Sequence, residues 1–550
     1  MALRYSEERN IQMIVYLMKQ YGIHNVIVCP GAGNITFVAT IQTDPFFHLW
    51  SVIDERSAVY MACGLAQETG EPVCVSVTCN AAVRNAIPGM TEAYYRNLPI
   101  LLCSFSYNFN NIGNYWPQVL DESVWPNDAQ KFTVGIPTIL NPEEEWKAGV
   151  NLNRALCHLL HQNGGPVHIV CETRFNKNYR EGVLPEAPVI EVCTQGDSLP
   201  ALSGGPVGIY AGNHKKWSDV LTEEVDRFCE LYDAVVICDN TSNYHGKYGI
   251  NPSIVWNQQK VEPEMKRFDV IIHIGSISGS YIIPKANRVW RVDRDGAIRD
   301  AFMKLSHVFE MEEAEFFRAY NEKAMTKPVG EMKFYGKWSN AVHELRKRVP
   351  KLPLSNAWIA QQSSMLLPEG SAVYFAILNT LRCWNLFELA PGVDGYSNTG
   401  AFGIDGGLST LMGMSFANPE KLYFGIFGDL GFFYDMNALG NRHLNHNVRI
   451  LVVNNGIGTE FKTYKHFAEE LGDEVDSFIA AQGHFNSPVL LKHYAQDLGM
   501  EYFSAASKEE FLKVYSSFFS AQAREKPLLF EVFTKSSDET EALKRMYNIL

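Results

Sequence analysis

The sequence lacks any long apolar segment: no uncharged apolar run in its 550 residues approaches the roughly 18 that a membrane-spanning helix needs. Its N-terminus also lacks the basic stretch followed by an apolar one that defines a secretory leader. The 11 cysteines occur singly, with no CxxC pair, which argues against a disulfide framework or a paired-cysteine metal site. We therefore expect a cytoplasmic protein with reduced, buried cysteines and no membrane partner.

Positive charge is also in deficit, with 48 Lys and Arg residues against 61 Asp and Glu residues and a net charge of −13 at pH 7. An acidic surface does not attract nucleic acids or anionic membranes. An anionic small molecule can still bind in one local cationic pocket. The composition is ordinary for a soluble globular protein, since 46% of the residues are hydrophobic and 20% are charged.

No fixed repeat period is visible, which excludes a solenoid, and the chain is too long for one core. Short apolar strands instead alternate with helices, a pattern typical of parallel sheets covered on both faces. In the first segment we expect strands near residues 25–29, 72–78, 99–105 and 166–171 and helices near 6–21, 55–69, 81–96 and 143–163. We expect three consecutive doubly wound α/β domains: residues 1–183, a linker at 184–206, residues 207–330, a connector at 331–355, and residues 356–550.

The most informative motif is GDLGFFYDMNALGNRHLNHNVRILVVNN, at residues 428–455. Asp429 follows one apolar strand, and Asn455 follows the next, some two dozen residues later. In a parallel sheet both strand ends meet at the carboxyl edge, where ligands bind. A carboxylate and an amide oxygen there suit Mg²⁺, and the helix N-terminus after Asp429 suits a diphosphate. Each dipeptide alone is also typical of an ordinary turn.

Two further segments carry candidate residues. IDERSAVYMACGLAQETG (53–70) places Glu55 in the first turn of a helix, where an acid also simply complements the helix dipole. SNTGAFGIDGG (397–407) is a glycine-rich loop that lets a backbone and a cofactor approach closely, although any strand-to-helix turn has similar glycines.

Together these segments resemble the thiamine-diphosphate enzymes of the 2-oxo-acid decarboxylase and acetolactate synthase superfamily. The likeness covers the whole chain, in the order pyrimidine-binding, middle and diphosphate-binding domain. It implies that Asp429, Asn455 and the carbonyl of Ile457 bind Mg²⁺. The neighbouring residues of the cofactor-binding turn would be Gly428, Leu430 and Gly431, with Leu430 in place of the usual second glycine.

The same resemblance assigns the remaining cofactor contacts. Glu55 would bond N1′ of the aminopyrimidine and so activate the cofactor. The Phe402 carbonyl, beside Gly403, would accept a hydrogen bond from the N4′ amine, and Ile404 would be the apolar wedge that bends the cofactor. It also implies a homodimer or homotetramer with active sites between subunits.

Within that superfamily the chain is most similar to the SEPHCHC synthases, which join 2-oxoglutarate to isochorismate, but its substrate positions depart from them. Gly33, Thr399 and Trp384 stand where that family carries arginines, although Arg382 lies two residues from Trp384. Guanidinium groups that grip carboxylates are not replaced by Gly, Thr or Trp. Glu460 stands where the family has an apolar side chain facing C2, which makes it a candidate catalytic residue.

We therefore expect a transferase or lyase that decarboxylates a 2-oxo acid and joins the product to an unknown acceptor in an altered pocket. One alternative is the SEPHCHC synthase reaction itself. Another is simple decarboxylation with Glu460 as proton donor, which lacks a supporting His-His pair. A catalytically silent subunit is disfavoured by the intact Glu55. The middle segment has no GxGxxG, so no dinucleotide is expected. The loop at 105–122 is a candidate substrate loop, and residues 462–487 a candidate lid.

Overall fold

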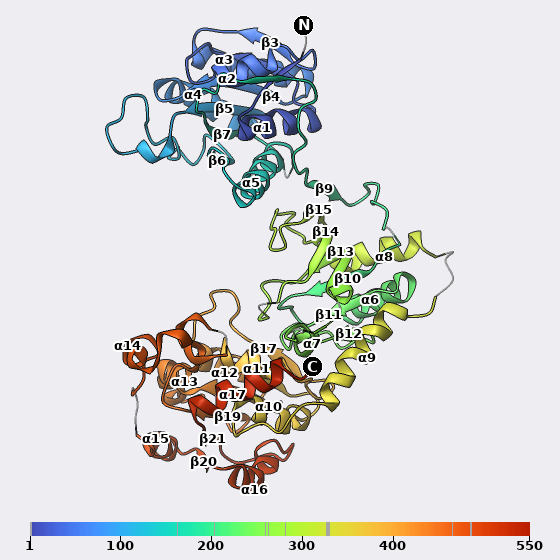
Figure 1. Cartoon of the computed structure of the whole chain (residues 1–550), viewed down its shortest axis with the longest axis vertical. Coiled ribbons are helices and arrows are strands. Elements are labelled where there is room, and N and C mark those ends of the chain that lie inside the picture. Colours follow the sequence, from blue (N-terminus) through green and yellow to red (C-terminus); the bar gives the residue numbers. More distant parts are fainter. Residues whose placement is uncertain are drawn as a thin grey trace. The chain divides into compact units, whose positions relative to one another are not determined.

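The computed structural model describes residues 3–161, 163–202, 204–258, 260–261, 263–280, 282–325, 330–464, 466–483 and 487–550 (Figure 1). Residue 162 of the expected helix 143–163, residue 203 of the expected linker, and residues 465 and 484–486 of the candidate lid lie outside these ranges. The chain forms two compact units. The first comprises Met1–Thr194 and Asp295–Glu310, and the second Gln195–Arg294 and Met311–Leu550. The expected domain boundaries stay predictions.

The first unit is built on a six-stranded parallel sheet with the order β3-β2-β4-β5-β7-β6. Its strands are β2 (Asn25–Val28), β3 (His48–Ser51), β4 (Val73–Thr78), β5 (Ile100–Ser106), β6 (Phe132–Ile136) and β7 (Val167–Glu172). Its main helices are α1 (Arg9–Gln20), α2 (Ile35–Ile41), α3 (Glu55–Thr69), α4 (Ala81–Arg96) and α5 (Pro142–Leu160). A two-stranded sheet of β1 (Arg4–Ser6) and β8 (Tyr179–Glu181) and the parallel pair β9 (Glu191–Thr194) and β15 (Leu305–Glu310) complete it.

Both faces of this sheet are buried, as its continuous apolar strands predict. Val26 and Val28 pack in a core with residues of α1, α2 and α5, whereas Ile27 packs on the other side with residues of α3 and α4. Because side chains alternate along a strand, β2, β4 and β5 supply both cores. Local sequence sets the helix starts: at α5 the Asn141 side chain accepts a hydrogen bond from the Glu144 N–H, and Pro142 occupies the first turn.

The second unit contains a sheet of the same topology, with the order β17-β16-β18-β19-β21-β20 and all strands parallel. Its strands are β16 (Ala372–Phe375), β17 (Asp394–Tyr396), β18 (Tyr423–Gly428), β19 (Val448–Asn454), β20 (Glu501–Ala505) and β21 (Leu528–Phe533). Its main helices are α10 (Asn356–Ser363), α11 (Asn379–Trp384), α12 (Gly407–Ser415), α13 (Asp429–Asp435), α15 (Leu490–Asp497), α16 (Lys508–Phe518) and α17 (Ser536–Tyr547). The order in which strands are added reverses at β16, because β17 lies on one side of it and β18 on the other. Such a switch point leaves a crevice at the carboxyl ends of β16 and β18.

The second unit also holds five parallel strands ordered β12-β11-β10-β13-β14. They are β10 (Val207–Ala211), β11 (Val235–Ile237), β12 (Gly249–Ile250), β13 (Arg267–Ile274) and β14 (Lys285–Val292), with helices α6 (Asp219–Tyr232), α7 (Ser253–Trp256), α8 (Glu313–Lys323) and α9 (Lys333–Lys347). The carboxyl edge of this sheet is closed by its own groups. The Asp239 carboxylate accepts hydrogen bonds from the N–H groups of Thr241 at 2.7 Å and Ser280 at 3.2 Å. The cavity beside it measures about 10 Å³.

None of the helices in the described ranges is long and apolar enough to cross a membrane.

Candidate cofactor and substrate site

Asp429 and the turn after β19 are in direct contact. One carboxylate oxygen of Asp429 accepts hydrogen bonds from the N–H groups of Asn455 at 3.1 Å and Gly456 at 2.6 Å. The other accepts from the Leu430 N–H at 2.8 Å. This contact follows from the parallel pairing of β18 with β19, in which Gly428 lies opposite Val453. The prediction from the sequence that the ends of these two strands are neighbours is therefore confirmed.

The other predicted metal ligands lie on the same turn. The Asn455 side-chain oxygen accepts a 3.4 Å hydrogen bond from the Ile457 N–H, and the Thr459 hydroxyl donates to the Ile457 carbonyl at 3.3 Å. The preceding Asn454 points the other way and donates to Glu531 at 2.7 Å. The Asp429 carboxylate thus contacts a turn of three residues, 455–457, that also carries the Asn455 amide oxygen and the Ile457 carbonyl.

The charge around this turn is negative. Burial raises the pKa of Asp429, and its backbone hydrogen bonds offset this only in part. Burial also raises the pKa of Glu531, and it raises the pKa of Glu539 to about 7. The charge of Asp429 contributes to both of these shifts. A divalent cation fits here, because it would offset the buried negative charge. The described residues contain no group of three or more His, Cys, Asp or Glu side chains that could hold a metal, so the remaining ligands would come from amide, carbonyl, phosphate or water oxygens.

The glycine-rich loop lies against the start of α13. A Cβ added to Gly431 would be 3.4 Å from the Ile404 carbonyl oxygen, so the loop backbone passes close to this helix. Phe402 has a positive φ of 55°, a conformation that costs energy for a bulky residue and is concentrated at ligand-binding sites. The predicted contacts Phe402, Gly403 and Ile404 therefore lie beside the predicted diphosphate turn.

Glu55 is the first residue of α3 in the first unit, as the sequence predicts. Asp54 caps this helix by accepting a hydrogen bond from the Arg56 N–H. The Glu55 carboxylate accepts a 3.1 Å hydrogen bond from the side-chain amide of Asn85, on α4. The carboxylate is thus oriented by a side chain from the neighbouring helix.

At the three positions where the similar synthases carry arginines, the residues of this chain are buried or closely surrounded by other atoms. A Cβ on Gly33 would lie 2.4 Å from the Phe105 carbonyl oxygen and 2.5 Å from the Thr78 hydroxyl, so this position has no room for any side chain. Thr399 is buried and accepts a 3.0 Å hydrogen bond from Asn213. Trp384 is fully buried, and its indole N–H donates to an asparagine of α10.

Arg382, by contrast, reaches the predicted site. Its two terminal nitrogens donate to the two carboxylate oxygens of Glu460 at 2.6 and 2.7 Å. Glu460 lies on the short helix η5 (Thr459–Lys462), directly after the metal-binding turn. Burial alone would lower the pKa of Arg382, but Glu460 raises it above its ordinary value. The carboxylate that we predicted to face a substrate is therefore occupied by a guanidinium.

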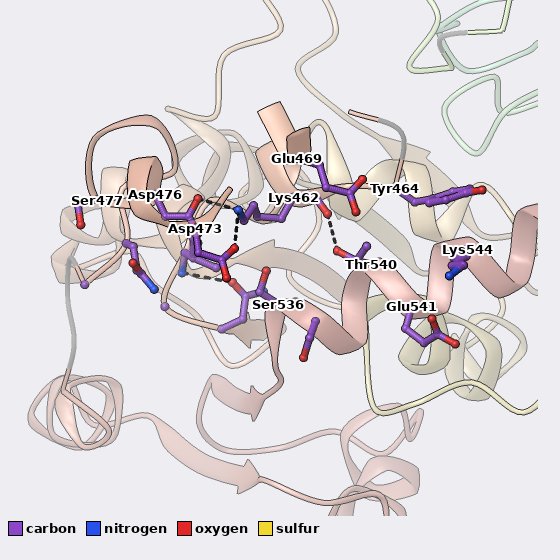
Figure 2. Close-up of a pocket in the computed structure, with 16 residues that line it drawn as sticks. Lys462, Tyr464, Glu469, Asp473, Asp476, Ser477, Ser536, Thr540, Glu541 and Lys544 are labelled. Carbon is purple, nitrogen blue, oxygen red and sulfur yellow. Dashed lines mark hydrogen bonds and ion pairs between the residues drawn. The ribbon is translucent and has the colours of Figure 1, made fainter. Parts of the chain in front are cut away.

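A cavity of about 940 Å³ borders the same turn (Figure 2). Its lining includes Asn455, Gly456 and Ile457, residues of the candidate lid, and five residues of α17 between Ser536 and Lys544. Lys462 lines it, with Asp473 and Asp476 each 2.9 Å from its ammonium group. The cavity is polar and contains both charge signs.

Sequence reasoning missed several residues of this site. Asn85 belongs to no recognisable motif, and it reaches Glu55 only because α3 packs against α4. Leu378 precedes α11 with φ 70° and ψ −124°, a backbone conformation that favours glycine. Glu531 and Glu539 could not be found from the spacing of the motif, because Glu531 lies within β21 and Glu539 lies in α17, which follows that strand.

Family models match at both six-stranded sheets. Residues 10–124 match the N-terminal thiamine pyrophosphate binding domain of the thiamine pyrophosphate enzymes, and residues 382–532 match the C-terminal one. These matches contain Glu55, Asp429 and Asn455. Fold and site together thus define a thiamine-diphosphate-dependent enzyme.

Similar proteins of known name identify the family within the thiamine-diphosphate enzymes. The 2-succinyl-5-enolpyruvyl-6-hydroxy-3-cyclohexene-1-carboxylate (SEPHCHC) synthase of Bacteroides fragilis is 31% identical over 576 residues, covering 99% of this chain and all of that protein. The synthases of Phocaeicola vulgatus and Bacteroides thetaiotaomicron are 29% and 28% identical over 99% of this chain. The chain belongs to the SEPHCHC synthase family.

Proposed function

We propose that this enzyme decarboxylates a 2-oxo acid and joins the remaining acyl unit to an acceptor, using thiamine diphosphate and Mg²⁺. The observation that carries the proposal is the hydrogen-bonded contact between Asp429 and the Asn455 turn, inside the region that matches the C-terminal cofactor-binding domain. The full-length likeness to a family of synthases supports a bond-forming outcome.

The metal and diphosphate would be held at the carboxyl ends of β18 and β19. Asp429, the Asn455 side chain and the Ile457 carbonyl would supply three hard oxygen ligands to Mg²⁺. The N–H groups at the start of α13, apart from that of Leu430, which donates to Asp429, would face the phosphates. When bound, the cofactor supplies the carbanion-stabilising ring that decarboxylation requires.

The protein's own contribution to activation would come from Glu55. Its carboxylate would hydrogen-bond the aminopyrimidine N1′ and share a proton with it. Asn85 would fix the direction of this carboxylate, because its amide donates to it from α4. Ile404 and the Phe402 carbonyl would set the position of the pyrimidine.

We further propose a homodimer, or a dimer of dimers, whose active sites combine Glu55 of one subunit with the Asp429 turn of the other. The apolar surface near Glu55 supports this. Ile53, Tyr60, Met61 and Tyr95 are all exposed, and they lie just before α3, on α3 and on α4. Exposed apolar groups gathered on neighbouring elements are typical of subunit interfaces.

The proposal is tested by a mass-spectrometric screen of 2-oxo acids with the Mg²⁺- and cofactor-loaded enzyme, with and without isochorismate. We expect CO₂ release from at least one acid and a new carbon–carbon bonded product with an acceptor. CO₂ with only the aldehyde as product would point to a simple decarboxylase. No turnover of any 2-oxo acid would contradict the proposal.

A second candidate is the SEPHCHC synthase reaction itself, which the 31% identity over 99% of the chain favours. Against it, Gly33, Thr399 and Trp384 provide no guanidinium for a substrate carboxylate. Each charge-assisted hydrogen bond contributes roughly 1.5–3 kcal/mol, so losing even two of these three contacts should weaken isochorismate binding on the order of 10²–10⁴-fold. Efficient product formation from 2-oxoglutarate and isochorismate would make this the function and remove the altered-pocket proposal.

A further inference from the structure

We propose that Asn80 and Glu122 are positioning residues that fasten the candidate substrate loop, residues 105–122, to the start of α4. Through α4 they would also hold Asn85, the residue that orients Glu55. Neither would touch the cofactor or a substrate. The inference rests on the proposed function, because it concerns how the loop and the activating acid of the same site are held together.

Asn80 and the end of the loop are joined by reciprocal hydrogen bonds. The Asn80 N–H donates to the Glu122 carboxylate at 2.6 Å, and the Asn80 side-chain oxygen accepts from the Leu120 N–H at 3.1 Å. Each segment thus supplies one backbone donor and one side-chain acceptor. This is the reciprocal pattern of a capping box, here formed between two distant segments of the chain.

Further contacts join the same two segments. The Arg84 guanidinium, near the start of α4, donates to the carbonyls of Asp121 at 2.9 Å and Val124 at 3.2 Å. The Cys79 thiol donates to the Gln118 carbonyl at 3.4 Å. Residues 79–84 and 118–124 are therefore bonded along their whole length.

The backbone of Asn80 is strained. Its φ of 68° and ψ of −116° lie in a region that glycine adopts readily and other residues rarely adopt. Such a conformation persists where the surroundings over-determine it, and it is concentrated at functional sites. A glycine here would have no strain but would also have no side-chain oxygen for Leu120. The asparagine is therefore kept in this conformation by its contacts with the loop.

Glu122 is a buried carboxylate whose hydrogen bonds are directed to this junction. It is 3% exposed, and burial raises its pKa, although its bonds to Asn80 and Ser104 oppose the shift. The Ser104 hydroxyl donates to its second oxygen at 2.8 Å and lies 2.8 Å from Nε2 of His168. Burial lowers the pKa of His168 to about 3, so this imidazole is neutral. A carboxylate bonded to neutral groups is buried at a cost in free energy, as expected of an acid that holds a backbone in place.

The junction is continuous with the support of Glu55. β3, β4 and β5 are parallel, so Glu55, Asn80 and the loop, which follow them in turn, lie at one carboxyl edge of the sheet. Asn85 is near the start of α4 and donates to Glu55. The two helices also pack closely, because a Cβ on Gly89 would be 2.7 Å from Cβ of Val59. A shift at the start of α4 would therefore be transmitted to the Glu55 carboxylate.

The first measurement is hydrogen exchange of the cofactor-free protein, followed by mass spectrometry of peptides from the loop. Glu122→Ala should speed exchange in the loop about 10–100-fold, the effect expected for loss of a hydrogen bond to a charged group. Glu122→Gln keeps an oxygen for the Asn80 N–H and should retain most of the protection. Asn80→Gly should also speed exchange in the loop, but without lowering Tm, because glycine adopts this backbone freely.

The second measurement is exchange of the C2 proton of thiamine diphosphate bound with Mg²⁺, followed by NMR. This exchange should be several-fold slower in Glu122→Ala, because Asn85 no longer holds Glu55 in one orientation. Asp44→Ala is the matched control. Asp44 is also a buried carboxylate of the first unit and accepts a 3.0 Å hydrogen bond from the Phe46 N–H, but it precedes β3, at the amino edge of the sheet. Its loss should lower Tm and change neither exchange rate.

Three results would overturn the inference: unchanged loop exchange in Glu122→Ala or Asn80→Gly, faster loop exchange with normal C2 exchange, and the same loop effect in Asp44→Ala. Asn80→Gly keeps the test decisive if Glu122→Ala does not fold. Loop exchange is measured without cofactor or substrate, so its failure is distinct from failure of the 2-oxo acid screen.

Discussion

The side-chain amide of Asn85 donates a 3.1 Å hydrogen bond to the carboxylate of Glu55. The two residues lie on neighbouring helices, 30 positions apart, and the bond aims the acid that the family resemblance assigns to cofactor activation. An acid that only complemented the dipole of α3 would need no such partner.

Glu55→Gln should bind thiamine diphosphate normally but exchange the C2 proton of the bound cofactor about 10²–10⁴-fold more slowly, because glutamine cannot share a proton with N1′. NMR of the exchange reaction measures this directly. Asn85→Ala keeps the carboxylate and should give a smaller loss. Normal exchange in Glu55→Gln would reduce Glu55 to a helix-dipole acid.

Gly33→Ala should destabilise the first unit by about 1–3 kcal/mol, because its Cβ would overlap the Phe105 carbonyl oxygen at 2.4 Å. The measurement is Tm by calorimetry. Gly149→Ala, in α5, is the control, since the nearest atom to its Cβ is the Met13 Cε at 3.4 Å. If both variants had the Tm of the unmodified protein, position 33 would have room for a side chain, which would contradict this prediction.

Glu539 should make the stability of the metal-free protein depend on pH. Its pKa is raised to about 7 by burial, so the folded protein keeps a proton that the unfolded chain loses near its ordinary value of 4.5. Stability from this group is therefore present at low pH and lost as pH rises from about 4.5 to about 7, by on the order of 3 kcal/mol. Glu539→Gln should raise Tm more at pH 8 than at pH 5. An equal change at both pH values would show that Glu539 does not carry this proton.

Mixing inactive Glu55→Gln and Asp429→Ala enzymes should restore activity if the proposed site is shared between subunits. Random re-pairing into dimers leaves one intact site in each mixed dimer, so about one quarter of the original activity should return. Mass spectrometry of the exchanged dimers provides the control. No recovery after proven exchange would place each site within one chain.

The contact between Asp429 and Asn455 could be predicted from the sequence because both residues follow strongly apolar strands separated by one helix. The start of α3 at Glu55 could also be predicted from the sequence, since aspartate is a common N-cap residue and Asp54 precedes the helix. Strands β3 and β20 were not predicted. Both are edge strands. Most side chains of β3 are exposed and most of β20 are only half-buried, so no buried apolar run identifies them.

The surroundings of the expected substrate-binding residues could not be predicted from the sequence. The sequence showed that Gly33 and Trp384 were not arginines, but only the structure shows that one has no space and the other lies in the core. The pairing of Arg382 with Glu460 joins residues 78 positions apart and depends on which strands are neighbours. Such contacts are set by tertiary packing and have no local pattern.

The central claim, that the Asp429 turn and Asn455 bind Mg²⁺ and thiamine diphosphate, is tested most directly by calorimetric titration of the cofactor with and without Mg²⁺. Asp429→Asn keeps an acceptor for the backbone N–H groups but removes the charge, and Glu531→Gln is the nearby control. We predict tight binding only with Mg²⁺ in the unmodified protein and in Glu531→Gln, and binding largely lost in Asp429→Asn. Undiminished, Mg²⁺-dependent affinity in Asp429→Asn would contradict the account.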